Sequence, residues 1–162
     1  QFYLPDLAKF ACGFAAVLGH IYPVFLKFRG GKGIASTIGV FLVAMSVSGV
    51  WVVVGIMSMV AAVLFIYFTE YGAMGSFIAI TPPAIAESIR FFFAYRDNNH
   101  IVLYYIAANM LIFLICFFTW FAHRKNIERM LAGEEHPTSI REMLMKYKAK
   151  KRAQKEQGND SA

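Results

Sequence analysis

The sequence predicts an all-α, polytopic helical membrane protein with about five transmembrane or membrane-embedded helices. Hydrophobic residues make up 58% of its 162 residues and charged residues only 16%, whereas soluble domains carry about 25% charged residues. Long apolar runs are separated by short polar turns, and no charge occurs between Gly33 and Glu70. Runs of this kind are typical of helices that cross a bilayer.

The first three helices are expected around a glycine-rich loop. Residues 4–26 are long enough to cross about 30 Å of hydrocarbon, and Pro23 should kink or end this helix near its far side. The uncharged run is too long for one span, so we divide it near residues 46–49 into helices at 34–45 and 50–68. The helix at 34–45 is short for a full crossing, and half-length helices are tolerated where they line a cavity.

Two more spans and a basic tail complete the chain. Residues 72–93 form the fourth helix, and neighbouring helices absorb the rearrangement that its Pro82–Pro83 pair demands. A polar loop at 95–100 precedes the last span at 101–121, which runs into a mostly helical stretch ending near Gly133. A further helix is expected around 139–151. We therefore divide the chain into a membrane-embedded part, residues 1–137, and a basic tail, residues 138–162.

Charge placement predicts the orientation of the spans. Asp6 with Lys9, and Glu87 with Arg90, are three residues apart and are expected to pair near the membrane interface. Five crossings put Lys9, Arg90 and Arg96 on one side and the other 13 of the 16 Lys and Arg residues on the opposite side. Because cytoplasmic segments carry the excess of Lys and Arg, the glycine-rich loop and the C-terminus are expected to face the cytoplasm.

The stretch GHIYPVFLKFRGGKG, residues 19–33, has the composition of an anion-binding loop. Glycine lacks a Cβ, so backbone N–H groups at Gly30, Gly31 and Gly33 can turn toward a phosphate, and Lys32 adds a positive charge. A helix that begins just after them would add the positive end of its dipole. The loop is not a Walker A motif, because Lys32 is followed by glycine and not by Ser or Thr. The alternative is a basic turn between two membrane segments.

His123 and Asn126 share one face of the helix that leaves the membrane, because they are three residues apart. The histidine could hydrogen-bond or protonate a phosphate, and the asparagine could orient a hydroxyl or a carbonyl. Alone, such a pair is more often structural, but a phosphate loop on the same side favours a catalytic role, and Ser76 comes to that side too. His20 lies in an apolar run, where a histidine is more often a structural residue than a catalyst.

Other kinds of site have no support in the sequence. Cys12 and Cys116 lie in distant apolar runs without CxxC or Cys/His spacing, so neither a disulfide framework nor a zinc site is expected. No cofactor is implied. The tail lacks aromatic interleaving among its basic residues, so nucleic acid is not expected as a partner.

Two separated motifs resemble one known family. The run GHIYPVFLKFRGGKGIASTIGV is similar to the second signature of the PlsY family of bacterial acyl-phosphate:glycerol-3-phosphate acyltransferases, and HRKNIERMLAGEE resembles its third, HxxNIxRLLxGxE. The turn EYGAMGSF resembles a family stretch whose serine corresponds to Ser76. The family's first signature is absent, and about five spans stand where seven are expected. We therefore interpret the chain as an N-terminally truncated member that cannot complete the site by itself.

The resemblance implies an enzyme of the bacterial cytoplasmic (inner) membrane that transfers an acyl group from acyl phosphate to the 1-hydroxyl of glycerol 3-phosphate. The products would be 1-acylglycerol 3-phosphate (lysophosphatidic acid), which begins phospholipid biosynthesis, and inorganic phosphate. The protein would be a monomer in the lipid bilayer. By position, Lys32, His123 and Asn126 would be catalytic, Glu135 would be structural, and the substrate-binding residues would be Gly30, Gly31, Gly33, Ser76 and His20. The alternatives are a transporter or channel subunit that binds a small phosphorylated anion, and a non-catalytic membrane scaffold.

Overall fold

The computed structural model describes residues 3–46, 49–95 and 102–134, together with residues 145, 147, 149 and 150. All the regular elements in these residues are helical, which confirms the predicted class. They are α1 (Tyr3–Ile21), the 3-10 helix η1 (Val24–Leu26), α2 (Ile34–Ser46), α3 (Val50–Thr69), α4 (Gly72–Tyr95), α5 (Val102–Ala122) and α6 (Arg124–Leu131).

Four helical stretches are long and apolar enough to cross a membrane, as expected of a multi-pass membrane protein. They are Pro5–Leu26, Trp51–Thr69, Gly72–Tyr95 and Val102–Ala122. The helix α2 has only 13 residues, which confirms the prediction of one short helix between two spans. Helix α1 ends two residues before Pro23, and α4 continues through Pro82 and Pro83.

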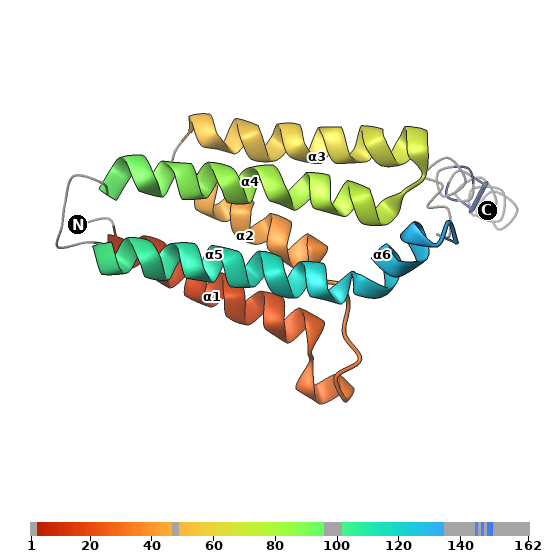
Figure 1. Ribbon diagram of the computed structural model, residues 1–162, viewed down its shortest axis with the longest axis horizontal. Coiled ribbons are helices and arrows are strands. Elements are labelled where there is room, and N and C mark those ends of the chain that lie inside the picture. The colour runs from red at the N-terminus through yellow and green to blue at the C-terminus, as the bar shows by residue number, and fades with distance from the viewer. Residues whose placement is uncertain are drawn as a thin grey trace, which may run out of the picture.

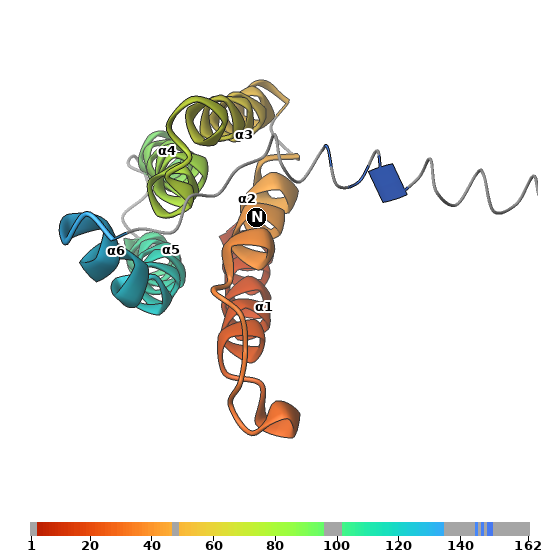
Figure 2. The ribbon, with the colours of Figure 1, turned by 90° about the vertical axis from the view of Figure 1, so that its right-hand side faces the viewer.

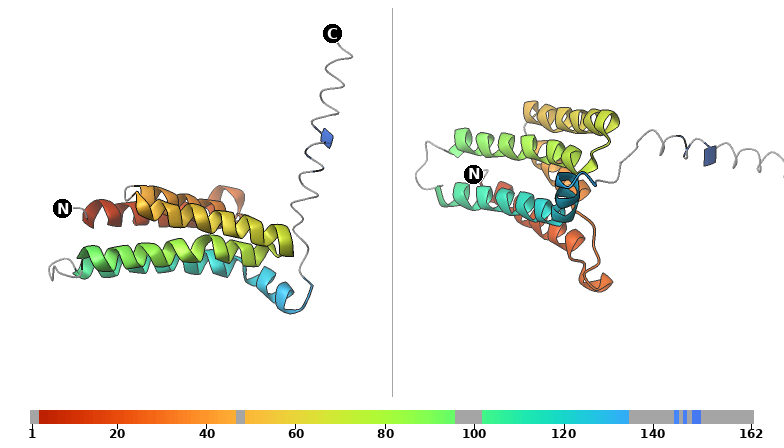
Figure 3. Two further views of the ribbon diagram at one scale, coloured as in Figure 1. Left: turned by 90° about the horizontal axis from the view of Figure 1, so that it is seen from above. Right: turned by 45° about the vertical axis from the view of Figure 1, so that its right-hand side comes forward.

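The long helices lie side by side along one direction (Figure 1). Seen from above, α1, α2 and α3 form one layer and α4 and α5 form the other (Figure 3). The view along the bundle shows α2 between α1 and α3 (Figure 2), and α2 packs against α1, α3 and α4. The short helix is therefore held by protein, as expected for a half-length helix at membrane depth.

Apolar side chains from three helices meet at Phe10, which is fully buried. Its ring lies edge-on to Phe91 of α4, with 5.7 Å between centroids, and tilted against Phe41 of α2 at 6.3 Å. Aromatic pairs at these separations add about 0.5–1.5 kcal/mol each beyond the area they bury. This contact ties α1 to α2 and to α4.

A buried hydrogen bond joins α2 to α5. The hydroxyl oxygens of Thr37 and Thr119 lie 2.8 Å apart, and Thr119 also donates to the carbonyl of Ile115 at 2.8 Å. A hydroxyl has only one hydrogen, so Thr119 must accept and Thr37 must donate. The bond fixes the first turns of α2 relative to the C-terminal part of α5.

At the end of the bundle where α1 begins, five polar side chains form what we call the buried ion cluster, in which Asp6 and Glu87 are buried and the other three are half-buried. Both predicted pairs are present, with Lys9 Nζ 3.3 Å from Asp6 Oδ1 and Arg90 Nη2 2.8 Å from Glu87 Oε2. Arg90 also lies 3.5 Å from Asp6, to which the hydroxyl of Tyr95 donates at 2.9 Å. Glu87 is fully buried within the protein, and the place of this pair near the membrane interface stays a prediction.

Several sequence predictions concern residues outside the described ranges. These include Glu135, the polar loop after Tyr95, and most of the helix expected at 139–151, in which Met145, Tyr147, Ala149 and Lys150 are helical. The expected stop near Gly133 is confirmed, because α6 ends at Leu131 and Gly133 has a φ of +71°. One boundary was not foreseen: the chain turns at His123, between α5 and α6.

Candidate active site

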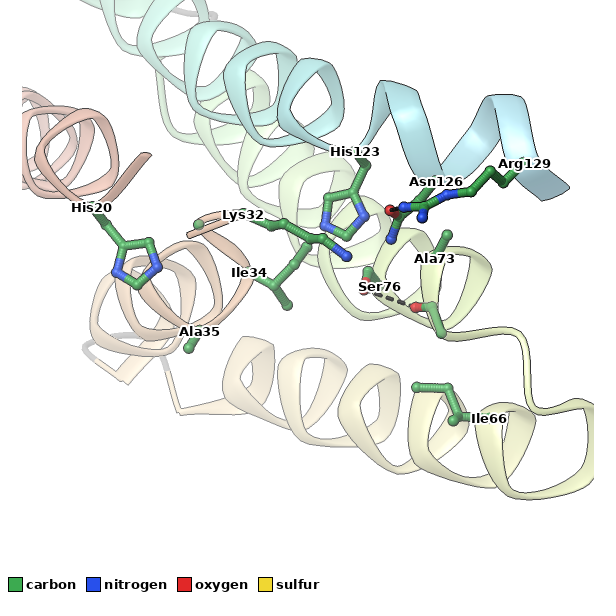
Figure 4. A pocket seen from close by; sticks show the side chains of 12 residues that line it. His20, Lys32, Ile34, Ala35, Ile66, Ala73, Ser76, His123, Asn126 and Arg129 are labelled. Atoms are coloured by element: carbon green, nitrogen blue, oxygen red, sulfur yellow. Dashed lines mark hydrogen bonds between the residues drawn. The ribbon is translucent and has the colours of Figure 1, made fainter. Parts of the chain in front are cut away.

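A pocket of about 620 Å³ opens at the end of the bundle opposite the buried ion cluster. The C-terminal ends of α1, α3 and α5 meet the N-terminal ends of α2 and α4 there. Figure 4 shows the side chains that point into it. The predicted site residues that line the pocket are His20, Lys32, Gly33, Ser76, His123 and Asn126, and Arg129 lines it too.

The N-terminus of α2 forms one wall of the pocket. The first amide with a backbone acceptor is that of Thr37, which donates to the carbonyl of Gly33 at 2.8 Å. The preceding amides of a helix have no acceptor within it, and Gly33, Ile34 and Ala35 line the pocket. With the dipole of α2 behind them and the exposed Lys32 beside them, these donors favour an anion. The predicted helix start directly after the glycines is confirmed.

Gly30 and Gly31 do not line this pocket, although the sequence placed them in the phosphate loop. A Cβ at Gly30 would collide with the carbonyl oxygens of His20 and Ile21, and one at Gly31 with the ring of His20. The N–H of Gly31 already donates to the carbonyl of His20 at 3.1 Å. These two glycines therefore let the loop pack against the end of α1. Their role in binding phosphate stays a prediction that this geometry does not favour.

Gly33 has the conformational role that the sequence predicted for a glycine in this loop. Its φ of +80° lies in the left-handed region, which side chains with a Cβ rarely adopt. A Cβ there would also approach Ile21 to 3.0 Å. The turn at Gly33 brings the chain from Lys32 into α2, so the cation and the helix N-terminus share one wall.

His123 lies at the junction of α5 and α6 and is only 3% exposed. Its backbone N–H donates to the carbonyl of Trp120 at 2.9 Å, which closes the turn between the helices. Within the described structure, neither ring nitrogen has a hydrogen-bond partner, and Phe77 covers the ring at 6.1 Å between centroids. Burial, assisted by the charge of Lys32, lowers the pKa of His123 to about 4. The imidazole is therefore neutral at pH 7 and available as an acceptor or a donor.

Ser76, Asn126 and Arg129 complete the opposite wall. The hydroxyl of Ser76 donates to the carbonyl of Gly72 at 2.9 Å, so its oxygen can still accept a hydrogen bond. The amide oxygen of Asn126 accepts from Arg129 Nη2 at 2.7 Å. Arg129 was not predicted as a site residue. The signal that could have identified it is the arginine of the HxxNIxRLLxGxE signature, which falls on Arg129, three residues after Asn126.

His20 approaches the pocket from the end of α1 and is exposed. Its carbonyl holds the amide of Gly31, and its ring packs where a Cβ at Gly31 would lie. These contacts give His20 a structural part in seating the loop. Contact of its ring with a substrate stays a prediction.

The pocket is cationic. Lys32 and Arg129 line it, and none of the described residues around it is acidic. Among the residues that the structure covers, no group of three or more His, Cys, Asp or Glu side chains lies close enough to hold a metal ion, and Cys12 and Cys116 are free thiols. Helix amides, two cations, an amide and a neutral imidazole are suited to binding a phosphorylated compound and stabilising charge on it.

Comparison with known proteins gives one consistent family. The sequence model of a family described as glycerol-3-phosphate acyltransferase matches residues 1–133. No solved structure matches the chain. The chain is similar to proteins named glycerol-3-phosphate acyltransferase, including those of Thermosipho melanesiensis, 39% identical over 79% of this chain and 54% of that protein, and Zymomonas mobilis, 39% identical over 81% and 55%. The chain spans about half the length of these curated relatives.

Proposed function

The chain belongs to the glycerol-3-phosphate acyltransferase family, and from this premise we propose that it transfers an acyl group from acyl phosphate to the 1-hydroxyl of glycerol 3-phosphate. The products are 1-acylglycerol 3-phosphate and inorganic phosphate, and the reaction supplies phospholipid synthesis. The observation that carries the proposal is the cationic pocket, in which Lys32 and the N-terminus of α2 face Asn126, His123 and Arg129. Both substrates carry a phosphate, and such a pocket attracts that group.

In the proposed reaction the glycerol hydroxyl attacks the acyl carbon directly. A new C–O ester bond forms, the bond from the acyl carbon to the phosphate oxygen breaks, and phosphate leaves with that electron pair. The hydroxyl proton passes to the departing phosphate or to His123. Ser76 supports direct attack, because its hydroxyl donates to the carbonyl of Gly72 and not to a base that would activate it. A stable acyl-enzyme trapped during turnover would contradict this mechanism.

The two walls have different parts in this mechanism. Lys32 and the amides at the start of α2 bind a phosphate and offset the negative charge that grows as it leaves. His123 is a weak base in the empty pocket, because burial and Lys32 lower its pKa to about 4. A bound phosphate offsets the charge of Lys32 and raises the pKa of His123. Substrate binding thereby prepares the imidazole to accept the proton.

The proposed setting is the cytoplasmic face of the bacterial inner membrane. The pocket and α6 lie at the end of the bundle that carries the glycine-rich loop, the side on which 13 of the 16 Lys and Arg residues are expected. We place the catalytic part within residues 1–137, assign residues 138–162 to a basic tail, and expect a monomer surrounded by lipid. The scheme requires no metal or cofactor, because acyl phosphate is already activated.

The test is acyl transfer by the protein produced from its complete open reading frame, reconstituted in lipid vesicles with palmitoyl phosphate. Release of inorganic phosphate and appearance of acylated product are expected only when glycerol 3-phosphate is added. Palmitoyl coenzyme A as donor, and glycerol as acceptor, are the matched controls and should both fail. Equal transfer from the coenzyme A ester would contradict the proposed donor. Uptake of glycerol 3-phosphate into the vesicles without acylation would favour the transporter alternative.

A further inference from the structure

We propose that Arg129 is a positioning residue, which fixes the side-chain amide of Asn126 so that its NH₂ group faces the substrate. The inference rests on the proposed function and concerns a residue to which no role has been assigned so far. Both side chains come from α6 and line the same pocket. Their contact is short, with 2.7 Å between Arg129 Nη2 and Asn126 Oδ1.

The chemistry of the two groups decides which end of the amide is free. A guanidinium can only donate hydrogen bonds, and only the oxygen of an amide can accept them. Arg129 therefore holds the oxygen of Asn126 and leaves its nitrogen, with two N–H donors, for a ligand. Figure 4 shows the amide between Arg129 and the cavity lined by Ser76, Lys32 and His123.

Arg129 is itself oriented by α6. Its Nε donates to the carbonyl of Lys125 at 3.3 Å, one turn earlier, so the planar guanidinium has two attachments to the helix. In the described part of the chain, no ion pair includes Arg129. Its charge thus strengthens the hydrogen bond to Asn126 without being offset by a carboxylate.

This arrangement determines what Asn126 can do for the reaction. Because Arg129 donates to its oxygen, Asn126 presents its two N–H groups to a phosphate oxygen or to the developing oxyanion, and donating is its part in the reaction. The sequence left open whether the amide acts as a donor or as an acceptor. The two cations at the pocket then have different roles. Lys32 binds the substrate directly, whereas Arg129 acts through Asn126.

The experiment is a double-mutant cycle in the full protein, with Asn126→Ala, Arg129→Ala and both together. Each single change should lower kcat about 10-fold to 100-fold, and the double variant should lose little more than Asn126→Ala. Arg129→Lys should recover part of the loss, since lysine can donate to the same oxygen. Arg124→Ala is the matched control on the same helix, and it should leave kcat unchanged because Arg124 does not line the pocket.

Asn126→Asp tests the direction of the hydrogen bond. Aspartate would still accept from Arg129, but it has no N–H to offer and would repel phosphate, so this variant should be as inactive as Asn126→Ala. Activity near that of the parent would overturn the inference. So would full additivity of Asn126→Ala and Arg129→Ala, or an effect of Arg129→Ala on KM alone, because Arg129 would then bind substrate independently.

The same cycle can be measured without turnover as the dissociation constant for glycerol 3-phosphate, by calorimetry. Non-additive weakening in the two single variants supports the inference even if the acyl donor has been misidentified. Additive weakening overturns it. A parent protein that binds glycerol 3-phosphate but transfers no acyl group contradicts the proposed function and not the role of Arg129.

Discussion

The two ends of the bundle contain similar numbers of charged and polar side chains but use them differently. In the buried ion cluster, Asp6, Lys9, Glu87 and Arg90 bind one another across α1 and α4. At the pocket, the described ion pairs include neither Lys32 nor Arg129, and both ring nitrogens of His123 lack a partner. Side chains that bind one another hold helices together, although Glu87 Oε1 also lacks a hydrogen-bond partner in the described structure, whereas groups left facing a cavity are available for a ligand.

The largest effect is expected from a substitution that disrupts the buried ion cluster. Arg90→Met leaves the fully buried Glu87 without its cation, which should lower the free energy of unfolding by about 3–5 kcal/mol. Thermal unfolding in detergent should show a lower Tm. The control Arg124→Met removes an exposed arginine and should change stability by less than about 1 kcal/mol. An unchanged Tm for Arg90→Met would mean that the cluster does not hold α1 to α4.

The next largest effect is expected from a substitution that removes a cation from the pocket. Lys32→Ala should lower kcat/KM for acyl transfer about 100-fold or more, because the leaving phosphate loses its direct counter-charge. Its Tm should match that of the parent, since Lys32 is exposed. Arg29→Ala is the matched control from the same loop, and it should keep its activity because Arg29 does not line the pocket. Equal losses in both variants would point to a general charge effect.

A third prediction concerns the pH dependence of stability that the pocket end contributes through His123. The pKa of His123 is lowered to about 4 in the folded protein from its ordinary value of 6.5, so the unfolded chain binds a proton first as the pH falls. Stability should therefore be constant above pH 6.5, fall between pH 6.5 and 4, and level off below, with a loss of at most about 3 kcal/mol. The measurement is the free energy of unfolding, obtained by chemical denaturation at several pH values for the parent protein and for His123→Leu. An identical slope in that variant would exclude His123 as the cause.

The smallest effect tests the scaffold below the pocket. Thr37→Val removes the donor of the buried bond to Thr119 and should lower stability by about 1 kcal/mol. The double variant with Thr119→Val should lose little more, because the two hydroxyls act as one pair. Thr69→Val serves as an exposed control and should be nearly neutral in thermal unfolding. A clear additional loss in the double variant would mean that the two hydroxyls do not act as one pair.

The helices could be predicted from the sequence because their signals are local. Apolar runs of known length and breaks at Pro23 and Glu70 set boundaries that the structure reproduces within a few residues. The pairing of Asp6 with Lys9 is local too, since the two residues lie on one helical face. What the sequence could not predict depends on contacts between distant segments.

Three residues show this limit. Glu87 is fully buried in the folded bundle, and no feature of its own helix indicates that. Gly31 is required by the ring and carbonyl of His20, so its role is visible only once the loop has folded back. The low pKa of His123 follows from burial under Phe77 and from the approach of Lys32. In each case the sequence gives the type of residue, but the surroundings of that residue depend on distant segments and could not be predicted.

The ion cluster also bears on how the protein enters its membrane. Asp6 and Lys9 belong to α1, and Glu87 and Arg90 to α4, which is synthesised later. A single charged residue at the centre of an inserting helix costs about 2.5–3.5 kcal/mol. Each helix carries its own counter-charge three residues away, so neither must wait for the other before insertion. The contact between Arg90 and Asp6 can then form within the bilayer, as two already neutral helices come together.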